Sequence, residues 1–254
     1  MRRIALINQK GGAGKTTTVA NLGACLASLG KKVLTVDLDP QANLSIHLGI
    51  KINELKHSVY DLLFWRTRPE RVILPTPVEG LHIIPSNINL SRAEIELVNM
   101  PSRKTILKDR LFLTFKKYDY ILIDCAPSLG LLTLNALIAV QEIFIPIQTQ
   151  FFALQGINRL LETVEIIRKK VNPLLKITGV IPVMYDTRTN LSHEVLEKIR
   201  EYFKKEVFKA VIRDNVRLAE SPSFGLPITL YSPNSYGAED YMKLAREVLS
   251  RDQK

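Results

Sequence analysis

The segment that decides the fold stands near the start of the chain and reads Ile4-Ala5-Leu6-Ile7-Asn8-Gln9-Lys10-Gly11-Gly12-Ala13-Gly14-Lys15-Thr16-Thr17. Its first residues are apolar and partly β-branched, which predicts a strand, and the glycines after them predict a tight loop. The next residues place Val19, Leu22 and Leu26 at helical spacing, which predicts a helix over 15–29. A strand, a glycine-rich loop and a helix in this order are typical of a phosphate-binding unit.

The residue types of this loop match what a bound triphosphate needs. Glycines allow backbone N–H groups to converge on phosphate oxygens, and the helix N-terminus adds partial positive charge. Lys15 can reach the β- and γ-phosphates, and the Thr16 hydroxyl can hold Mg²⁺. The expected ATP and Mg²⁺ site consists of Lys10, Gly11, Gly12, Ala13, Gly14, Lys15, Thr16 and Thr17.

The start of the loop departs from the usual phosphate-binding pattern. That pattern has a glycine five residues before Gly14, where this chain has Gln9, and a second lysine, Lys10, follows. A lysine at this point can turn away from its own phosphates and toward those of a second subunit. Lys10 therefore suggests that nucleotide binding and dimerisation are one event.

Short β-branched runs alternate with longer helical patterns along the rest of the chain. Strands are expected over 4–7, 33–36, 120–123, 143–146 and 177–181, with a weaker edge strand over 81–84. Helices are expected over 15–29, 154–170, 190–203 and 238–249. The strands are apolar throughout, as parallel strands covered on both faces are. The pattern predicts an α/β fold with a doubly wound, mostly parallel sheet of the P-loop type and ligands at the carboxyl ends of the strands.

Two acidic residues end the second strand. Asp37 and Asp39 are expected to point the same way because strand side chains alternate. An acid that emerges beside a phosphate site can orient the waters of Mg²⁺ or the attacking water. Both residues are candidates for this role.

A third acid, Asp124, follows the apolar run 120–123. Its place after a strand fits a Walker B acid near Mg²⁺. Further along, Ser128 and Gly130 either belong to a loop that senses the γ-phosphate or lie at the start of a helix that Ser128 caps.

Length and composition limit the class of protein. The chain has no linker or low-complexity segment, so residues 1–254 are expected to form a single P-loop ATPase domain. The first apolar run is too short for a secretory leader, and the longest one falls short of the roughly 20 residues of a membrane helix. The two cysteines, Cys25 and Cys125, favour a reducing cytoplasm and are expected in the core.

The net charge of +10 favours attraction of a polyanion such as nucleic acid or anionic lipid. The excess lies in 2–32 and 103–117, whereas 186–220 holds eight basic and seven acidic residues. A binding patch must therefore be assembled by folding.

The loop and the acids together resemble a known family. Residues 10–16 are similar to the deviant Walker A signature of the ParA/MinD family, and residues 37–41 are similar to its second motif. The segments 186–190 and 215–223 resemble the chromosomal ParA (Soj) branch, whose members are chromosome partitioning ATPases. The likeness extends over most of the chain.

This resemblance implies an ATPase that forms a sandwich homodimer on ATP binding. Lys10 would cross the interface, and Gly11 would lie at the close contact between subunits. Asp39 would support the hydrolytic water, and Asp124 would be the Walker B acid. The catalytic residues implied are Lys10, Lys15 and Asp39, and the metal site implied is Thr16, Asp39 and Asp124.

The resemblance also implies partners. In the chromosomal branch the dimer binds double-stranded DNA without sequence preference on the nucleoid, and a ParB-type centromere-binding protein stimulates hydrolysis and releases it. Arg188 and Arg217 match DNA-contacting arginines, although Asp214 places an acid beside them where the family often has Pro-Arg-Asn. The residues that match those flanking the base are Pro182, Met184 and Asn215.

Two other classes share parts of this pattern. A membrane-cycling ATPase of the MinD type needs a terminal amphipathic helix, and apolar residues at helical spacing do occur in 241–249. Acidic residues on the opposite face favour packing of that helix onto the domain, without stable membrane association. Iron proteins with the same signature bind a cluster through paired cysteines, whereas Cys25 lies in the first helix and Cys125 beside Asp124.

Overall fold

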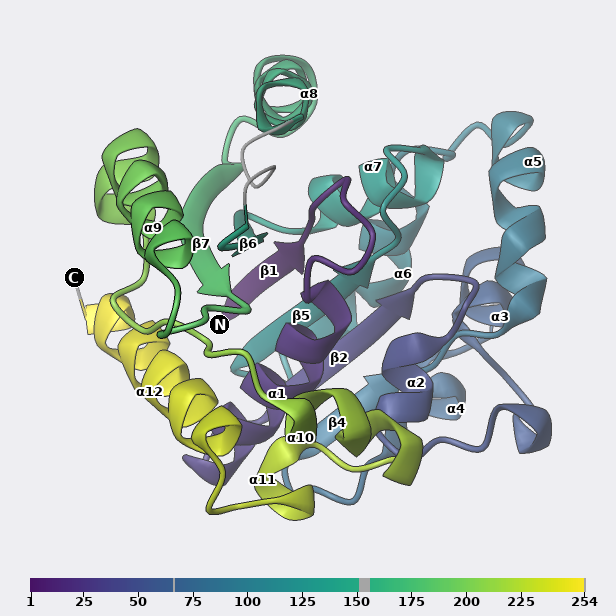
Figure 1. Cartoon of the computed structure of the whole chain (residues 1–254). Coiled ribbons are helices and arrows are strands. Elements are labelled where there is room, and N and C mark those ends of the chain that lie inside the picture. The colour runs from purple at the N-terminus through teal and green to yellow at the C-terminus, as the bar shows by residue number, and fades with distance from the viewer. Residues whose placement is uncertain (66, 151–155, 254) are drawn as a thin grey trace.

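A central β-sheet organises the computed structural model, which describes residues 1–65, 67–150 and 156–253. Within these residues the sheet has seven strands in the order β3-β4-β2-β5-β1-β6-β7 (Figure 1). All neighbouring strands are parallel except β3 and β4. The strands are β1 (Arg2–Leu6), β2 (Val33–Leu38), β3 (Leu74–Pro75), β4 (Leu81–Ile84), β5 (Tyr120–Cys125), β6 (Glu142–Gln148) and β7 (Lys176–Val183).

Helices connect the strands and cover both faces of the sheet (Figure 1). The α-helices of the described residues are α1 (Lys15–Ser28), α2 (Asn43–His47), α3 (Val59–Phe64), α4 (Pro69–Val72), α5 (Ala93–Val98), α6 (Ile106–Phe115), α7 (Leu131–Ala139), α8 (Ile157–Lys170), α9 (Asn190–Phe203), α10 (Val216–Glu220), α11 (Ile228–Tyr231) and α12 (Tyr236–Ser250). The short 3₁₀ turns are η1 (Ile52–Glu54), η2 (Ile88–Arg92), η3 (Lys204–Glu206), η4 (Ser221–Phe224) and η5 (Arg251–Gln253).

The sheet separates two hydrophobic cores. Ile4 and Leu6 of β1 join the core formed with α1, α2, α11 and α12. Ala5 of β1 and Ile7, directly after the strand, join the core formed with α3 to α9. Because successive strand side chains point to opposite faces, a strand covered on both sides must be apolar at nearly every position. The doubly wound α/β fold predicted from the apolar runs is confirmed, and Cys25 and Cys125 are buried as predicted.

The C-terminal helix α12 packs on the first helix. Its residues Tyr241, Leu244 and Val248 are buried, and the Tyr241 hydroxyl lies 3.2 Å from Thr18 Oγ1 of α1. The apolar face of α12 is therefore used inside the fold. In the parts of the chain that the structure describes, no helix combines the length and apolar character needed to cross a membrane.

The outer strand of the sheet differs from the prediction. The segment 81–84 was predicted as the edge, but β4 lies between β2 and the two-residue strand β3. Two residues are too few to produce a periodic signal, and Pro75 in β3 cannot donate to the sheet, which suits an outermost position. The predicted helix over 154–170 begins at Ile157 within the described residues, and its predicted first residues lie outside them.

A glycine in β7 makes room for two aromatic rings. Gly179 pairs with Phe144 of β6, next to an irregularity in the register. The Phe144 ring meets Phe208 edge to face, with 5.2 Å between centroids and 77° between planes. A side-chain carbon on Gly179 would overlap both rings.

We expect Gly179→Ala to lower the free energy of unfolding by roughly 1–3 kcal/mol, because both rings would have to move in a packed core. Urea unfolding followed by circular dichroism measures this change. Lys176→Ala, at an exposed position of the same strand, is the control. An unaltered unfolding midpoint for Gly179→Ala would contradict this prediction, because it would mean that the two rings move aside without loss of packing.

Candidate functional site

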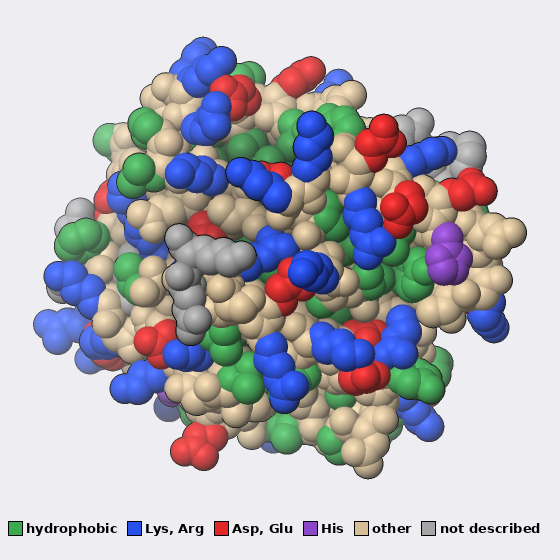
Figure 2. Space-filling view, turned by 90° about the vertical axis from the view of Figure 1, so that its left-hand side faces the viewer, with side chains coloured by type: hydrophobic (Ala, Val, Ile, Leu, Met, Phe, Trp, Pro, Cys, Tyr) green, Lys and Arg blue, Asp and Glu red, His purple; other side chains and the backbone are tan. Residues whose placement is uncertain are grey.

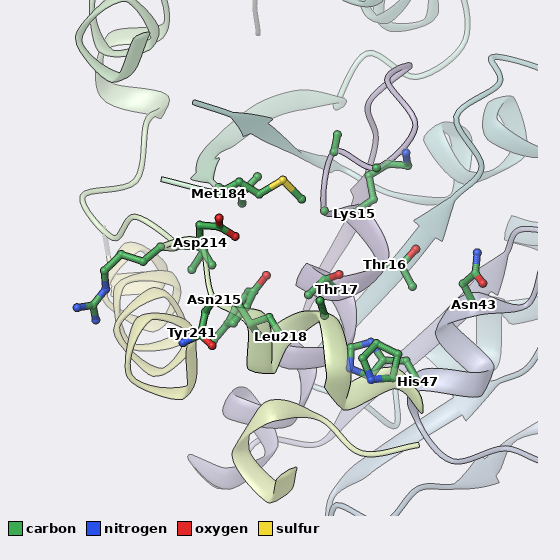
Figure 3. A pocket seen from close by; sticks show the side chains of 18 of the residues that line it. Lys15, Thr16, Thr17, Asn43, His47, Met184, Asp214, Asn215, Leu218 and Tyr241 are labelled. Carbon is green, nitrogen blue, oxygen red and sulfur yellow. The ribbon is translucent and has the colours of Figure 1, made fainter. Parts of the chain in front are cut away.

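A cavity of about 470 Å³ opens at the carboxyl ends of the strands (Figure 3). Its walls come from the loop residues 12–17, from α2, from the end of β7 and from the segment 212–222. Figure 3 shows Met184 and Asp214 on one side of the cavity and His47 on the other. The predicted phosphate loop therefore forms part of a real depression in the molecule.

The loop backbone has a shape that requires glycine. Gly12 and Gly14 have φ angles of 72° and 78°, which are unfavourable for residues that carry a Cβ. Helix α1 begins at Lys15 directly after Gly14, and no side chain of the described residues caps its first turn. The first N–H groups of α1 therefore remain available for an anion.

The two lysines of the loop lie in different environments. Lys15 lines the cavity and is only 7% exposed, with Nζ at 3.5 Å from the carbonyl oxygen of Lys10. Burial lowers the pKa of Lys15, and the negative charge of Asp124 acts in the opposite direction. The Lys10 and Gly11 residues are exposed and do not line the cavity. The geometry thus separates a lysine inside the cavity from one outside it.

A buried acid lies beneath the start of α1. Asp124 accepts a hydrogen bond of 2.7 Å from Thr16 Oγ1 through Oδ2, whereas its buried Oδ1 has no partner among the described residues. Burial, together with the charge of Asp37, raises the pKa of Asp124 well above its usual range. A hydroxyl beside a carboxylate oxygen without a partner is an oxygen donor set that suits Mg²⁺. Thr16 and Asp124, two of the three residues of the predicted metal site, therefore suit Mg²⁺.

The structure distinguishes the two acids after β2. Asp37 is fully buried and accepts hydrogen bonds from Ser45 N at 2.9 Å, Ser45 Oγ at 2.7 Å and Asp39 N at 3.1 Å. These bonds hold α2 against the sheet and occupy the carboxylate. Burial raises the pKa of Asp37 to about 6, although the bonds from Ser45 oppose this. Asp39 lies half-buried past the strand end. The negative charge of Asp39 acts to raise the pKa of Lys15.

The residues predicted to flank a base fall partly in the cavity wall. Met184 and Asn215 line the cavity, and the Asn215 side chain also caps α10 by accepting from Arg217 N at 2.9 Å. Pro182 instead is buried within β7, where its carbonyl accepts from Ile212 N at 2.9 Å. Its neighbour Val183 takes the place in the wall. Asp214 also lines this part of the cavity.

Comparison with known proteins identifies the family. A family model described as an AAA domain matches residues 1–177. The chain is 51% identical over 245 residues to the sporulation initiation inhibitor protein Soj of Bacillus subtilis (strain 168), covering 96% of this chain and 97% of that protein. It is 48% identical over 251 residues to the chromosome-partitioning ATPase Soj of Treponema pallidum (strain Nichols), covering 99% and 98%. The chain belongs to the ParA/Soj family of chromosome-partitioning ATPases.

A solved structure supports the fold assignment for this ParA/Soj chain. The cobyrinic acid a,c-diamide synthase from Mycobacterium smegmatis, with bound ADP and magnesium, matches with a TM-score of 0.88 and 35% identity. The match covers 100% of this chain and 96% of that one. The P-loop ATPase fold predicted from the loop and the strand pattern is confirmed.

Gln148 is a site residue that the sequence reasoning missed. It ends β6, and its Nε2 donates to the carbonyl of Gly12 at 2.9 Å and lies 3.3 Å from Met184 Sδ. Met184 itself has a φ of 53°, which is uncommon for a residue with a side chain. Gln148 therefore ties the phosphate loop of the ParA/Soj chain to the opposite wall. A polar residue closing an apolar strand was the available signal.

His47 forms part of the other wall. It is almost fully buried, and its Nε2 lies 3.2 Å from Ser221 Oγ of η4. Burial lowers the pKa of His47 to about 4, so the ring is neutral near pH 7. The contact joins α2 to the segment that carries α10. Nothing near His47 in the sequence indicates this partner, because Ser221 is far away along the chain.

The helix after Asp124 is capped from another element. Helix α7 begins at Leu131, and Glu94 of α5 accepts hydrogen bonds from Leu131 N at 2.8 Å and Leu132 N at 3.2 Å. A side chain at Gly130 would collide with this carboxylate. Ser128 was one predicted cap, but it contributes its carbonyl to Thr133 Oγ1. Glu94 therefore holds the end of the loop that follows Asp124.

We expect Glu94→Ala to lower the free energy of unfolding by about 1–2 kcal/mol, because it removes an acid that satisfies two N–H groups at a helix N-terminus. Hydrogen exchange at Leu131 and Leu132 should become faster in the same variant. Glu94→Gln keeps an acceptor without the charge, and its free energy of unfolding should lie between those of the unaltered chain and Glu94→Ala. Unchanged exchange at both amides in Glu94→Ala would contradict this assignment of the cap.

Proposed function

We propose that this ParA/Soj-family ATPase segregates DNA: MgATP closes a homodimer, the dimer holds double-stranded DNA, and hydrolysis stimulated by a ParB-type centromere-binding protein releases it. The observation that supports this proposal best is the separation of the loop lysines. Lys15 is buried in the cavity of its own chain, whereas Lys10 is exposed outside it. Such a lysine is free to meet the phosphates of a second copy.

The nucleotide is bound by the loop and the start of α1. Backbone N–H groups of residues 12–17 face the phosphate oxygens, and the Lys15 ammonium adds an attraction to the phosphates that water screens little inside the cavity. Thr16 and Asp124 would hold Mg²⁺, which when bound would neutralise charge on the phosphates. Met184 and Asn215 flank the base. The buried Oδ1 of Asp124 supports this assignment, because it has no hydrogen-bond partner among the described residues and a cation would supply one.

Hydrolysis needs a water held in line with the terminal phosphate. Asp39 suits this role because its carboxylate lies past the end of β2 and accepts one hydrogen bond, from Gln41 N to Oδ1, whereas that of Asp37 is buried and occupied by Ser45. Asp39 orients the water by accepting a hydrogen bond from it. Lys10 from the second copy would complete the site, with Gly11 allowing close approach. Gly11 has nothing within 4 Å of the place where a Cβ would stand.

The arginines assigned to DNA are exposed beside the cavity. Arg188 and Arg217 have 84% and 54% of their side chains exposed. Contacts to phosphates need no reading of bases, so binding without sequence preference requires only such flexible cations. On this proposal the protein is cytoplasmic and associates with the nucleoid. The membrane-cycling alternative requires a free amphipathic helix, whereas the apolar face of α12 is buried on α1.

We expect Lys15→Ala to weaken ATP binding by about 100-fold, because a charged hydrogen bond contributes roughly 1.5–3 kcal/mol, and to abolish the ATP-dependent dimer. Asp39→Ala should keep ATP and remain a DNA-bound dimer, because only the positioning of water is lost. Size-exclusion chromatography with light scattering, with ATP or ADP and with or without duplex DNA, measures both. A monomeric Asp39→Ala protein at saturating ATP would refute the mechanism.

We expect Arg217→Glu to lose DNA association at low salt, since a repelling charge replaces a phosphate contact, while ATP binding persists. Fluorescence anisotropy with a labelled duplex measures the loss. Arg168→Glu is the matched control, because Arg168 also forms an exposed ion pair three residues away, with Glu165 on α8. Equal DNA binding by Arg217→Glu and the unaltered chain would remove Arg217 from the DNA surface.

A further inference from the structure

Two segments far apart in the sequence meet at the rim of the cavity. Tyr185 and Arg213 form an isolated parallel bridge, with hydrogen bonds from Tyr185 N to Ile212 O at 3.1 Å and from Asp214 N to Tyr185 O at 3.0 Å. The first segment leads to Arg188, and the second leads into α10, which carries Arg217. The two arginines therefore lie on neighbouring segments, 185–188 and 213–220, which are together called the rim.

Both arginines already have an acidic partner on their own segment. Arg188 binds Asp186 through two bonds, Nε to Oδ1 and Nη2 to Oδ2, each of 2.9 Å. Arg217 Nη1 binds Glu220 Oε2 at 2.9 Å. A bidentate carboxylate occupies the same edge of a guanidinium group that a phosphate would use. Any phosphate that approaches this rim must compete with these carboxylates.

The two acids are held in place by other groups. Asp186 Oδ1 also accepts from Arg188 N at 3.0 Å, and Glu220 Oε2 also accepts from the Tyr231 hydroxyl at 2.9 Å. The arginine side chains, in contrast, are long and largely exposed. When a polyanion arrives, the arginines can move toward it while the acids stay.

A third arginine on the rim, Arg213, is held firmly by several partners. Arg213 binds Asp240 through Nε at 2.8 Å and Nη2 at 2.6 Å, binds Glu239, and lies over the Tyr236 ring at 4.2 Å. Its side chain is only 27% exposed. Arg188 and Arg217 are each hydrogen-bonded to one carboxylate, and among the described residues no aromatic ring lies over either of them. Exposed ion pairs of this kind contribute little to stability, so replacing the carboxylate with a phosphate should cost little free energy of folding.

The rim is also not a region of excess positive charge. Residues 186–220 are nearly neutral in a chain of net charge +10. On the face in Figure 2, Asp and Glu side chains lie among the Lys and Arg side chains. The net positive charge of the chain attracts a polyanion from a distance, but at the rim acidic side chains compete with it for the arginines.

We propose that Asp186 and Glu220 restrain Arg188 and Arg217 and thereby set the affinity of this rim for the DNA backbone. This inference rests on the proposed function. Each subunit then contributes a weak contact, and a dimer that presents two rims binds firmly because the second contact is intramolecular. Opening the dimer releases DNA without any change within a rim.

The test replaces each acid by its amide, Asp186→Asn and Glu220→Gln, singly and together in the full chain. Both amides keep an acceptor for the bonds to Arg188 N and to the Tyr231 hydroxyl, and thermal unfolding verifies the fold. Glu165→Gln on α8 is the control, because it makes the same charge change at an exposed arginine pair elsewhere. A labelled duplex of mixed sequence is titrated with a non-hydrolysable ATP analogue and Mg²⁺ over a range of salt.

Each rim variant should bind the duplex about threefold to tenfold more tightly, with a dependence on log salt steeper by about 0.9 per arginine freed, and Glu165→Gln should not. Unchanged affinity in both rim variants, while Arg217→Glu loses DNA, overturns this inference and leaves the proposed function standing. An equal gain in Glu165→Gln also overturns it, since net charge alone would then suffice. If Arg217→Glu keeps full DNA binding, the proposed DNA surface fails, and the inference fails with it.

Discussion

The hydrogen bond between Thr16 and Asp124 joins the first helix to the central strand, and the ligand-binding end of the molecule depends on it. The parallel register places Asp124 beside Leu6 of β1 and Asp37 of β2, so the segments after three strands converge there. In the part of the chain that the structure describes, the buried Oδ1 of Asp124 has no hydrogen-bond partner, which is unfavourable unless another group satisfies it. A cation bound at this point would supply that partner.

Polar contacts over long sequence distances hold the walls of the cavity to the loop. Gln148 connects the loop to Met184, and His47 connects α2 to the segment after α10. Helix α10 has two roles in this arrangement, because Leu218 lines the cavity while Arg217 is exposed. A movement of the cavity wall at Leu218 would therefore also move Arg217 on the outer surface, because both belong to the same five-residue helix.

Much of the fold could be predicted because its signals are local. The helix predicted over 190–203 is found as Asn190–Phe203, since its apolar residues recur at helical spacing and Thr189 caps it through a bond from Ser192 N. The apolar strand runs were recognisable because both faces of the sheet are covered. Strand β3 was not predicted, because its place depends on pairing with β4 rather than on its own residues. The Glu94 cap of α7 has the same origin.

By itself the sequence determined the strand, glycine loop and helix of the predicted phosphate site, the family, and the candidate acids, because these depend on residue types within a few positions of one another. The tertiary structure distinguished the two acids: Asp37 is fully buried and accepts two hydrogen bonds from Ser45, whereas Asp39 is half-buried and accepts one from Gln41 N. It also placed Pro182 within the sheet and Val183 in the wall. Burial and hydrogen-bond partners are set by residues distant in the chain, and only folding brings those together.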